Sequence, residues 1–310
     1  MVNATRMGGT PLIMCMKKAM FNRTVATVGL TALLWLLCTL TIPDPLQAAI
    51  FFDSDFETCN VGTGNDFPCE GWDDVGLEWF TAPTDNTLEI TNTDRFTGSK
   101  SVKASFNAPM GDGTVKPSLY HNVPLTNHMF MRAALHRNAA FQTCAFNNST
   151  KMIRFRGNNQ GPGGGYPVVM IIQQSLGYRI SVEGGYGMGS VVYPGGPTVG
   201  AAWEQVEMEV KFNTPGVADG IIRFWVNGTL YIERLNLQLR GPTPTSVNGQ
   251  GIVNPSTYRF DTAQIYIQCG SGNIWYDRIA VGDTRIGPVQ STSASADSTP
   301  PARPTLNPIP

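Results

Sequence analysis

Residues 203–234 read WEQVEMEVKFNTPGVADGIIRFWVNGTLYIER, and this stretch decides the fold. In its first half, the segment VEMEVKF alternates apolar residues with Glu and Lys. This period of two is typical of a β-strand with one buried face. In its second half, IIRFWV ends at Asn227-Gly228, a dipeptide typical of hairpins because both turn positions take positive φ. The stretch predicts antiparallel strands joined by tight turns.

The composition fits an all-β protein that does not bind nucleic acid. Of 310 residues only 15% are charged, and the chain holds 33 Gly and 22 Pro, which suits short strands joined by many turns. The formal net charge is −1 and no basic run occurs, so nothing indicates a nucleic-acid partner. With three histidines in all, a histidine-rich metal centre is not expected.

The amino-terminal 49 residues resemble a targeting segment. Lys17-Lys18 precedes an apolar run at residues 25–42, and Ala48-Ala49 offers a cleavage site, as in a secretory signal. The alternative is an uncleaved membrane anchor, because the run approaches spanning length. Both interpretations put the protein outside the cytoplasm, at the cell surface, in the periplasm or in the medium, and only the second involves a membrane.

The remaining chain divides into a domain and a tail. Residues 50–287 contain the strand patterns, whereas residues 288–310 are rich in Pro, Ser and Thr, which indicates a disordered tail. Four cysteines follow the leader, and an even number in an exported chain favours disulfides. Cys59 and Cys69 bracket a short Gly- and Asp-rich loop and form the expected first pair, which leaves Cys144 with Cys269.

About a dozen short strands and no convincing helix predict a two-sheet antiparallel sandwich. Besides the opening stretch, the expected strands are 50–58, 88–90, 101–106, 129–137, 151–157, 168–174, 178–182, 263–269 and 273–281.

In order along the chain, six segments resemble the concanavalin A-like lectin/glucanase jelly rolls, in particular secreted bacterial polysaccharide-lyase-like and LamG-like domains. They are FDSDFE at 52, TGSKSV at 97, KMIRFRG at 151, WEQVE at 203, GIIRFWVNG at 220 and WYDRIAVG at 275. The resemblance covers about residues 50–287. It implies an all-β jelly-roll sandwich that holds a polysaccharide on the concave face of one sheet.

If that implication holds, the outward-alternating residues of neighbouring strands form the candidate site. These are Arg132, His136, Arg154, Arg156, Gln173 and Tyr178, with Tyr186, Tyr193 and Trp203 as stacking surfaces for sugar rings. Arginine suits carboxylate or sulfate groups because its guanidinium binds them in a bidentate manner.

Three functions follow from this set. The first is non-catalytic polysaccharide binding. The second is a lyase that cleaves a uronate polymer by β-elimination, in which Arg154, Arg156 or Gln173 neutralises the carboxylate and His136 or Tyr178 is the base. The third is a structural or adhesive surface protein, in which the sandwich is only a spacer.

The resemblance also implies a structural calcium ion that ties the first and last strands. Glu57 and Asp277 occupy matching places in those strands. The alternative is ordinary edge-strand charge, which discourages pairing between sheets of different molecules.

Overall fold

The computed structural model describes residues 49–63, 69–78, 87–108, 116–145, 148–157, 167–186, 189–241, 245–246, 252–253 and 259–289. The predicted leader and nearly all of the predicted tail lie outside these residues, so both stay predictions. In the part of the chain that is described, no helix is long and apolar enough to cross a membrane.

The first sheet is built around the stretch that predicted the fold. Its strands run in the order β14-β13-β12-β7-β18-β5-β4-β2, and β1 also pairs with β18. Their bounds are β1 Ile50–Ser54, β2 Gly62–Thr63, β4 Thr87–Thr91, β5 Ser101–Ala108, β7 His128–Arg137, β12 Glu204–Lys211, β13 Gly220–Val226, β14 Thr229–Leu237 and β18 Gly270–Gly282.

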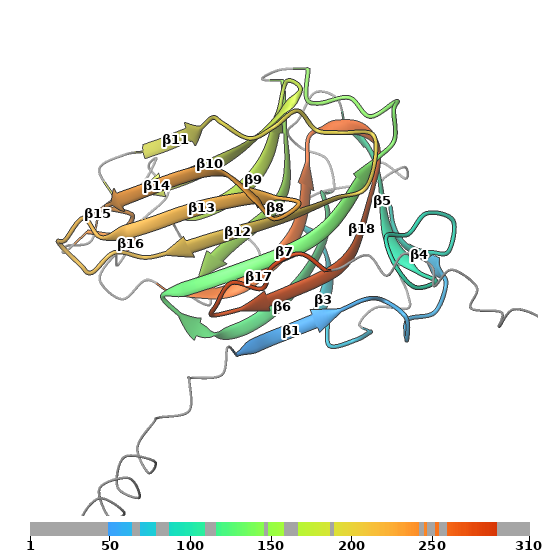
Figure 1. Ribbon diagram of the computed structural model, residues 1–310, viewed down its shortest axis with the longest axis horizontal. Helices are drawn as coiled ribbons and strands as arrows, with labels where there is room; N and C mark the ends of the chain where they lie inside the picture. The colour runs from blue at the N-terminus through green and yellow to red at the C-terminus, as the bar shows by residue number, and fades with distance from the viewer. Residues whose placement is uncertain are drawn as a thin grey trace, which may run out of the picture. The chain divides into compact units, whose positions relative to one another are not determined.

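The second sheet faces the first and completes an antiparallel sandwich (Figure 1). Its order is β11-β10-β9-β8-β17-β6-β3. The bounds are β3 Asp74–Glu78, β6 Lys116–Thr126, β8 Ser149–Gly157, β9 Val168–Gln174, β10 Gly177–Gly185, β11 Gly189–Tyr193 and β17 Phe260–Gln268, and a small separate ladder joins β15 Thr245–Ser246 to β16 Ile252–Val253. The predicted all-β jelly-roll sandwich is confirmed.

The apolar positions of the opening stretch form the core between the sheets. Val206, Met208 and Val210 of β12 are fully buried. Just beyond β12, the ring of Phe212 stacks on Phe260 of the second sheet with centroids 4.1 Å apart. Burying one phenylalanine stabilises a fold by about 1.5–3 kcal/mol, so contacts of this kind hold the two layers together.

The predicted hairpin turn is present between β13 and β14. Asn227 has φ of 50° and Gly228 has φ of 80°, and Val226 pairs directly with Thr229. Positive φ at both positions matches the right-handed twist of the flanking strands. The turn therefore fixes the register that buries alternate residues of β13.

Both predicted disulfides are confirmed. Cys59 bonds Cys69 across ten residues, and Cys144 bonds Cys269 across 125 residues. The second bridge joins the connection after β7 to the turn between β17 and β18.

Candidate functional site

The second sheet carries polar side chains on the face that points away from the core. In β8, Ile153 and Phe155 belong to the core, so Arg154 and Arg156 project from the opposite face. The register with β17 sets Arg154 beside Gln264 and Arg156 beside Thr262. We call this surface the outer polar face; its members are Ser118, Arg154, Arg156, Thr262, Gln264 and Tyr266.

A chain of contacts holds the Arg154 guanidinium in one orientation. Its Nε donates to Gln264 Oε1 at 2.5 Å, and Gln264 Nε2 donates in turn to Ser118 Oγ. The guanidinium carbon lies 3.6 Å from the centre of the Tyr266 ring, and Tyr266 OH donates to Gln268 Oε1 at 3.1 Å. A cation held over an aromatic face and by an amide is pre-organised for a planar anion.

These polar residues are nearly as buried as the core. Arg154 is 9% exposed, Arg156 is 5% exposed and Gln264 is fully buried. Arginine is almost never buried without partners, because removing its charge from water is costly. Two partnered guanidinium groups therefore lie on one face of one strand.

An apolar strip lies beside the arginines on the same face. Val168, Met170 and Ile172 of β9 form a buried cluster separate from the main core, and Met170 pairs with Arg154 in register. Apolar side chains beside a few fixed polar groups are typical of ligand sites.

Two of the predicted site residues belong to the other layer. Arg132 and His136 lie in β7 of the first sheet, on its outer face. Arg132 donates to the carbonyls of Arg278 and Gly287, both at 3.3 Å. Grouping them with Arg154 on one face was wrong, because alternation shows which residues share a face of a strand but not which sheet the strand joins.

His136 is instead part of an aromatic cluster on the first sheet. Its Nδ1 lies 2.6 Å from Asp94 Oδ2 and its Nε2 lies 3.0 Å from the carbonyl oxygen of Ala201. Trp203 donates from Nε1 to the same carboxylate at 2.8 Å, and Trp275 stacks on the His136 ring. Trp203 is therefore separated from the outer polar face as well.

Gln173 and Tyr178 were also wrongly assigned to the outward face, because both point toward the interior. Gln173 lies on the same face of β9 as the core residues Val169 and Ile171, and it is the cross-strand partner of Tyr178. Tyr178 is fully buried and donates from its hydroxyl to Glu204 Oε2 at 2.8 Å. Burial, together with the Glu204 carboxylate, raises the pKa of Tyr178 well above its ordinary value, so this phenol is a core hydrogen-bond donor.

The two other predicted stacking residues lie at the edge of the second sheet. Tyr193 ends the edge strand β11 and packs against the core, with the Arg234 guanidinium 5.3 Å from its ring centre. Partial burial raises the pKa of Tyr193. Tyr186 donates from its backbone to the Leu239 carbonyl at 3.1 Å, and its ring lies so close to Gly241 that a Cβ there would clash.

Sequence reasoning missed the contribution of β17. Within FDTAQIYIQ, the polar residues Thr262, Gln264 and Tyr266 alternate with buried apolar ones. The signal was therefore present in the sequence, because a strand that is buried on one face and polar on the other offers the polar face to a site.

Glu57 and Asp277 do not form a donor set that fits calcium. Glu57 accepts hydrogen bonds from the backbone amides of Ser99 and Lys100 at 2.7 and 2.9 Å. Asp277 accepts from three backbone amides, at 2.7 to 3.0 Å. Calcium needs six to eight oxygen ligands, whereas these carboxylates face N–H donors. In the described ranges, no group of three His, Cys, Asp or Glu residues is placed to hold a metal.

Comparison with known proteins gives the fold. No protein-family model and no curated sequence matches the chain. The structure of endo-β-1,4-glucuronan lyase from the fungus Trichoderma reesei is similar, with a TM-score of 0.52, 21% identity, and coverage of 76% of this chain and 96% of that one. The cellulose-induced protein Cip1 is similar with a TM-score of 0.50, 17% identity, and coverage of 77% and 100%. These likenesses confirm the predicted jelly-roll fold.

Proposed function

We propose that the outer polar face binds an acidic polysaccharide. The observation that carries the proposal is the buried Arg154 guanidinium, which Gln264 and the Tyr266 ring hold in place, with Arg156 on the same face two residues along β8. A pair of fixed guanidinium groups suits a row of carboxylates or sulfates.

Two further facts support an exported, glycan-binding protein. Disulfides persist in oxidising compartments, and the described residues contain two. The similar fold of a glucuronan lyase supports the same class of ligand, because that enzyme by its name acts on an acidic polysaccharide. Function on a shared fold depends on the site, and here the site contains two arginines.

The test is binding of the full chain to a panel of acidic and neutral polysaccharides. Arg154→Ala should weaken binding of an acidic polymer by about 10- to 100-fold, since a hydrogen bond to a charged group contributes about 1.5–3 kcal/mol. The matched control is Arg285→Ala, which removes an equal charge from a side chain that is 48% exposed and lies over Trp225 of the first sheet. Equal loss in both variants would contradict the proposed face.

A second candidate, a β-eliminating polysaccharide lyase, is favoured by the tyrosines beside the arginines. Tyr266 lies under Arg154, and the half-buried Tyr120 pairs with Gln264. In β-elimination, an arginine would neutralise the uronate carboxylate and a phenolate would remove the C5 proton. The C4–O bond then breaks, and a tyrosine returns a proton to the leaving oxygen.

Incubation with uronate polymers separates the candidates. A lyase generates unsaturated uronate ends that absorb in the ultraviolet, and Tyr266→Phe or Tyr120→Phe should then abolish turnover while binding persists. Binding without new absorbance identifies a lectin-like protein. If the chain neither binds nor cleaves any polymer, the structural or adhesive function is the one that remains.

A further inference from the structure

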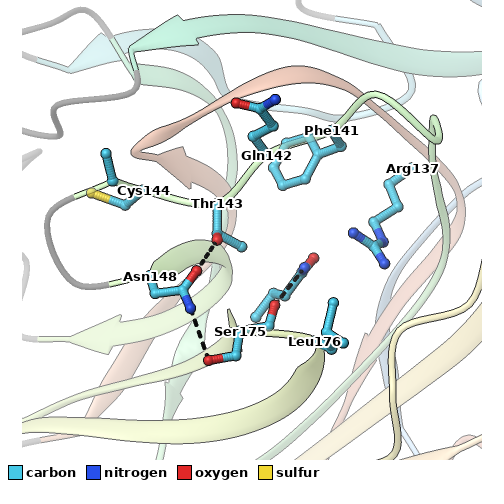
Figure 2. Close-up of a pocket in the computed structure, with 10 residues that line it drawn as sticks. Arg137, Phe141, Gln142, Thr143, Cys144, Asn148, Ser175 and Leu176 are labelled. Carbon is cyan, nitrogen blue, oxygen red and sulfur yellow. Dashed lines mark hydrogen bonds between the residues drawn. The ribbon is translucent and has the colours of Figure 1, made fainter.

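A second site opens at one end of the sandwich, away from the outer polar face. It is a pocket of about 590 Å³ between the connection that follows β7 and the turn that joins β9 to β10. Arg137, Phe141, Thr143 and Ser175 contribute to its wall, and Figure 2 shows their side chains arranged around the opening. Pockets of about 300–1,000 Å³ hold small molecules.

Two buried polar atoms in this pocket lack partners within the described part of the chain. Gln173 is 1% exposed and its Oε1 accepts no hydrogen bond, although its Nε2 donates to the Ser175 carbonyl at 3.1 Å. Arg137 Nε is likewise buried and unpaired, while its NH2 donates to the Val199 carbonyl at 2.9 Å. Nearly all buried polar groups in native proteins have a partner, so a free donor and a free acceptor in one pocket indicate a ligand.

The rim that surrounds these atoms is fixed before any ligand arrives. Thr143 Oγ1 donates to Asn148 Oδ1 at 2.6 Å, and Asn148 Nδ2 donates to Ser175 Oγ at 2.9 Å (Figure 2). Cys144, also in the wall, is tied to Cys269. A rigid rim reduces the entropy lost on binding.

We propose that this pocket binds a single acidic sugar unit, a hexuronate, apart from the polymer on the outer polar face. Arg137 Nε donates to the sugar carboxylate, a sugar hydroxyl donates to Gln173 Oε1, and Phe141 contacts the apolar side of the ring. One donor with positive charge and one neutral acceptor match a molecule that carries both a carboxylate and hydroxyls. The choice of sugar rests on the proposed function, whereas the pocket itself does not.

The test is calorimetric titration of the full chain with glucuronate, glucose and acetate. Glucuronate should bind saturably, and glucose and acetate at least about tenfold more weakly, because each of them satisfies one of the two atoms. Gln173→Met and Arg137→Lys should each weaken glucuronate binding about tenfold. Arg137→Lys keeps the charge and removes the Nε donor. Gln173→Met removes the unpaired acceptor together with the Nε2 hydrogen bond to the Ser175 carbonyl, so it should lower the unfolding midpoint only slightly.

The outer polar face supplies the control. Arg154→Ala should leave glucuronate binding in the pocket unchanged while it weakens polymer binding, so that the two proposals fail separately. The pocket proposal is overturned by an absence of saturable glucuronate binding, by equal affinity for acetate, or by loss of glucuronate binding in Arg154→Ala alone.

Discussion

Replacing Cys144 and Cys269 together by alanine should cost more stability than replacing Cys59 and Cys69. A disulfide stabilises mainly by restricting the unfolded chain, and the effect grows with the logarithm of the loop length. The Cys144–Cys269 bridge closes a separation of 125 residues, and the Cys59–Cys69 bridge closes a separation of ten. The chain-entropy relation gives about 5 kcal/mol for the long loop and about 3 kcal/mol for the short one.

The assay is equilibrium unfolding of the full chain in urea, followed by tryptophan fluorescence and extrapolated to water. Since Cys59 and Cys144 are both nearly fully buried, each double variant loses buried sulfur, so the two are compared directly with each other. The Cys144/Cys269 variant should be less stable by about 2 kcal/mol. A larger loss of stability in the Cys59/Cys69 variant would refute the entropic argument. It would indicate instead that packing of the amino-terminal loop contributes more to stability than the length of the closed loop.

Three further predictions concern single groups. Burial raises the pKa of the Asp277 carboxyl from 3.8 to about 6 despite its amide donors. Between about pH 4 and pH 6 the folded state therefore keeps a proton on Asp277 that the unfolded state has lost. The free energy of unfolding should fall by up to about 3 kcal/mol as pH rises through this range. Urea titrations at several pH values should show this slope, and Asp277→Asn should remove it. Tyr178→Phe should lower the free energy of unfolding by about 1–3 kcal/mol, because the partly buried Glu204 loses a hydrogen-bond donor. The same variant should leave glycan binding and any turnover unchanged. Altered glycan binding would show that Tyr178 belongs to the site. A chelator should leave the melting temperature unchanged, since Glu57 and Asp277 accept hydrogen bonds from backbone amides. A clear drop in melting temperature would indicate a structural calcium ion.

Much of the architecture was predictable because it depends on local chemistry. Positive φ favours Asn227-Gly228 at a hairpin, and the apolar residues of β12 have one face to bury. The disulfide pairs followed from four cysteines in a chain predicted to be exported and from one short loop. The outward placement of Arg154 and Arg156 was predictable for the same reason, since both lie opposite Ile153 and Phe155 across a single strand.

The misplacement of Arg132 and His136 has a physical origin, which is that a site on a sheet is assembled by register between strands distant in sequence. Arg154 meets Gln264 across 110 residues, and no local pattern specifies that β8 pairs with β17 while β7 joins the other layer. Tyr178 is a different case, because it shares its face of β10 with the buried Ile180 and Val182 while Arg179 and Glu183 lie on the other face, so the local pattern already indicated its inward orientation. Charge gives a partial remedy: a basic residue that alternates with core residues must leave the core, whereas a tyrosine or glutamine can remain there if it finds a partner. For a sheet of this kind, an arginine is therefore a better guide than a tyrosine or glutamine to which face of its own strand points away from the core.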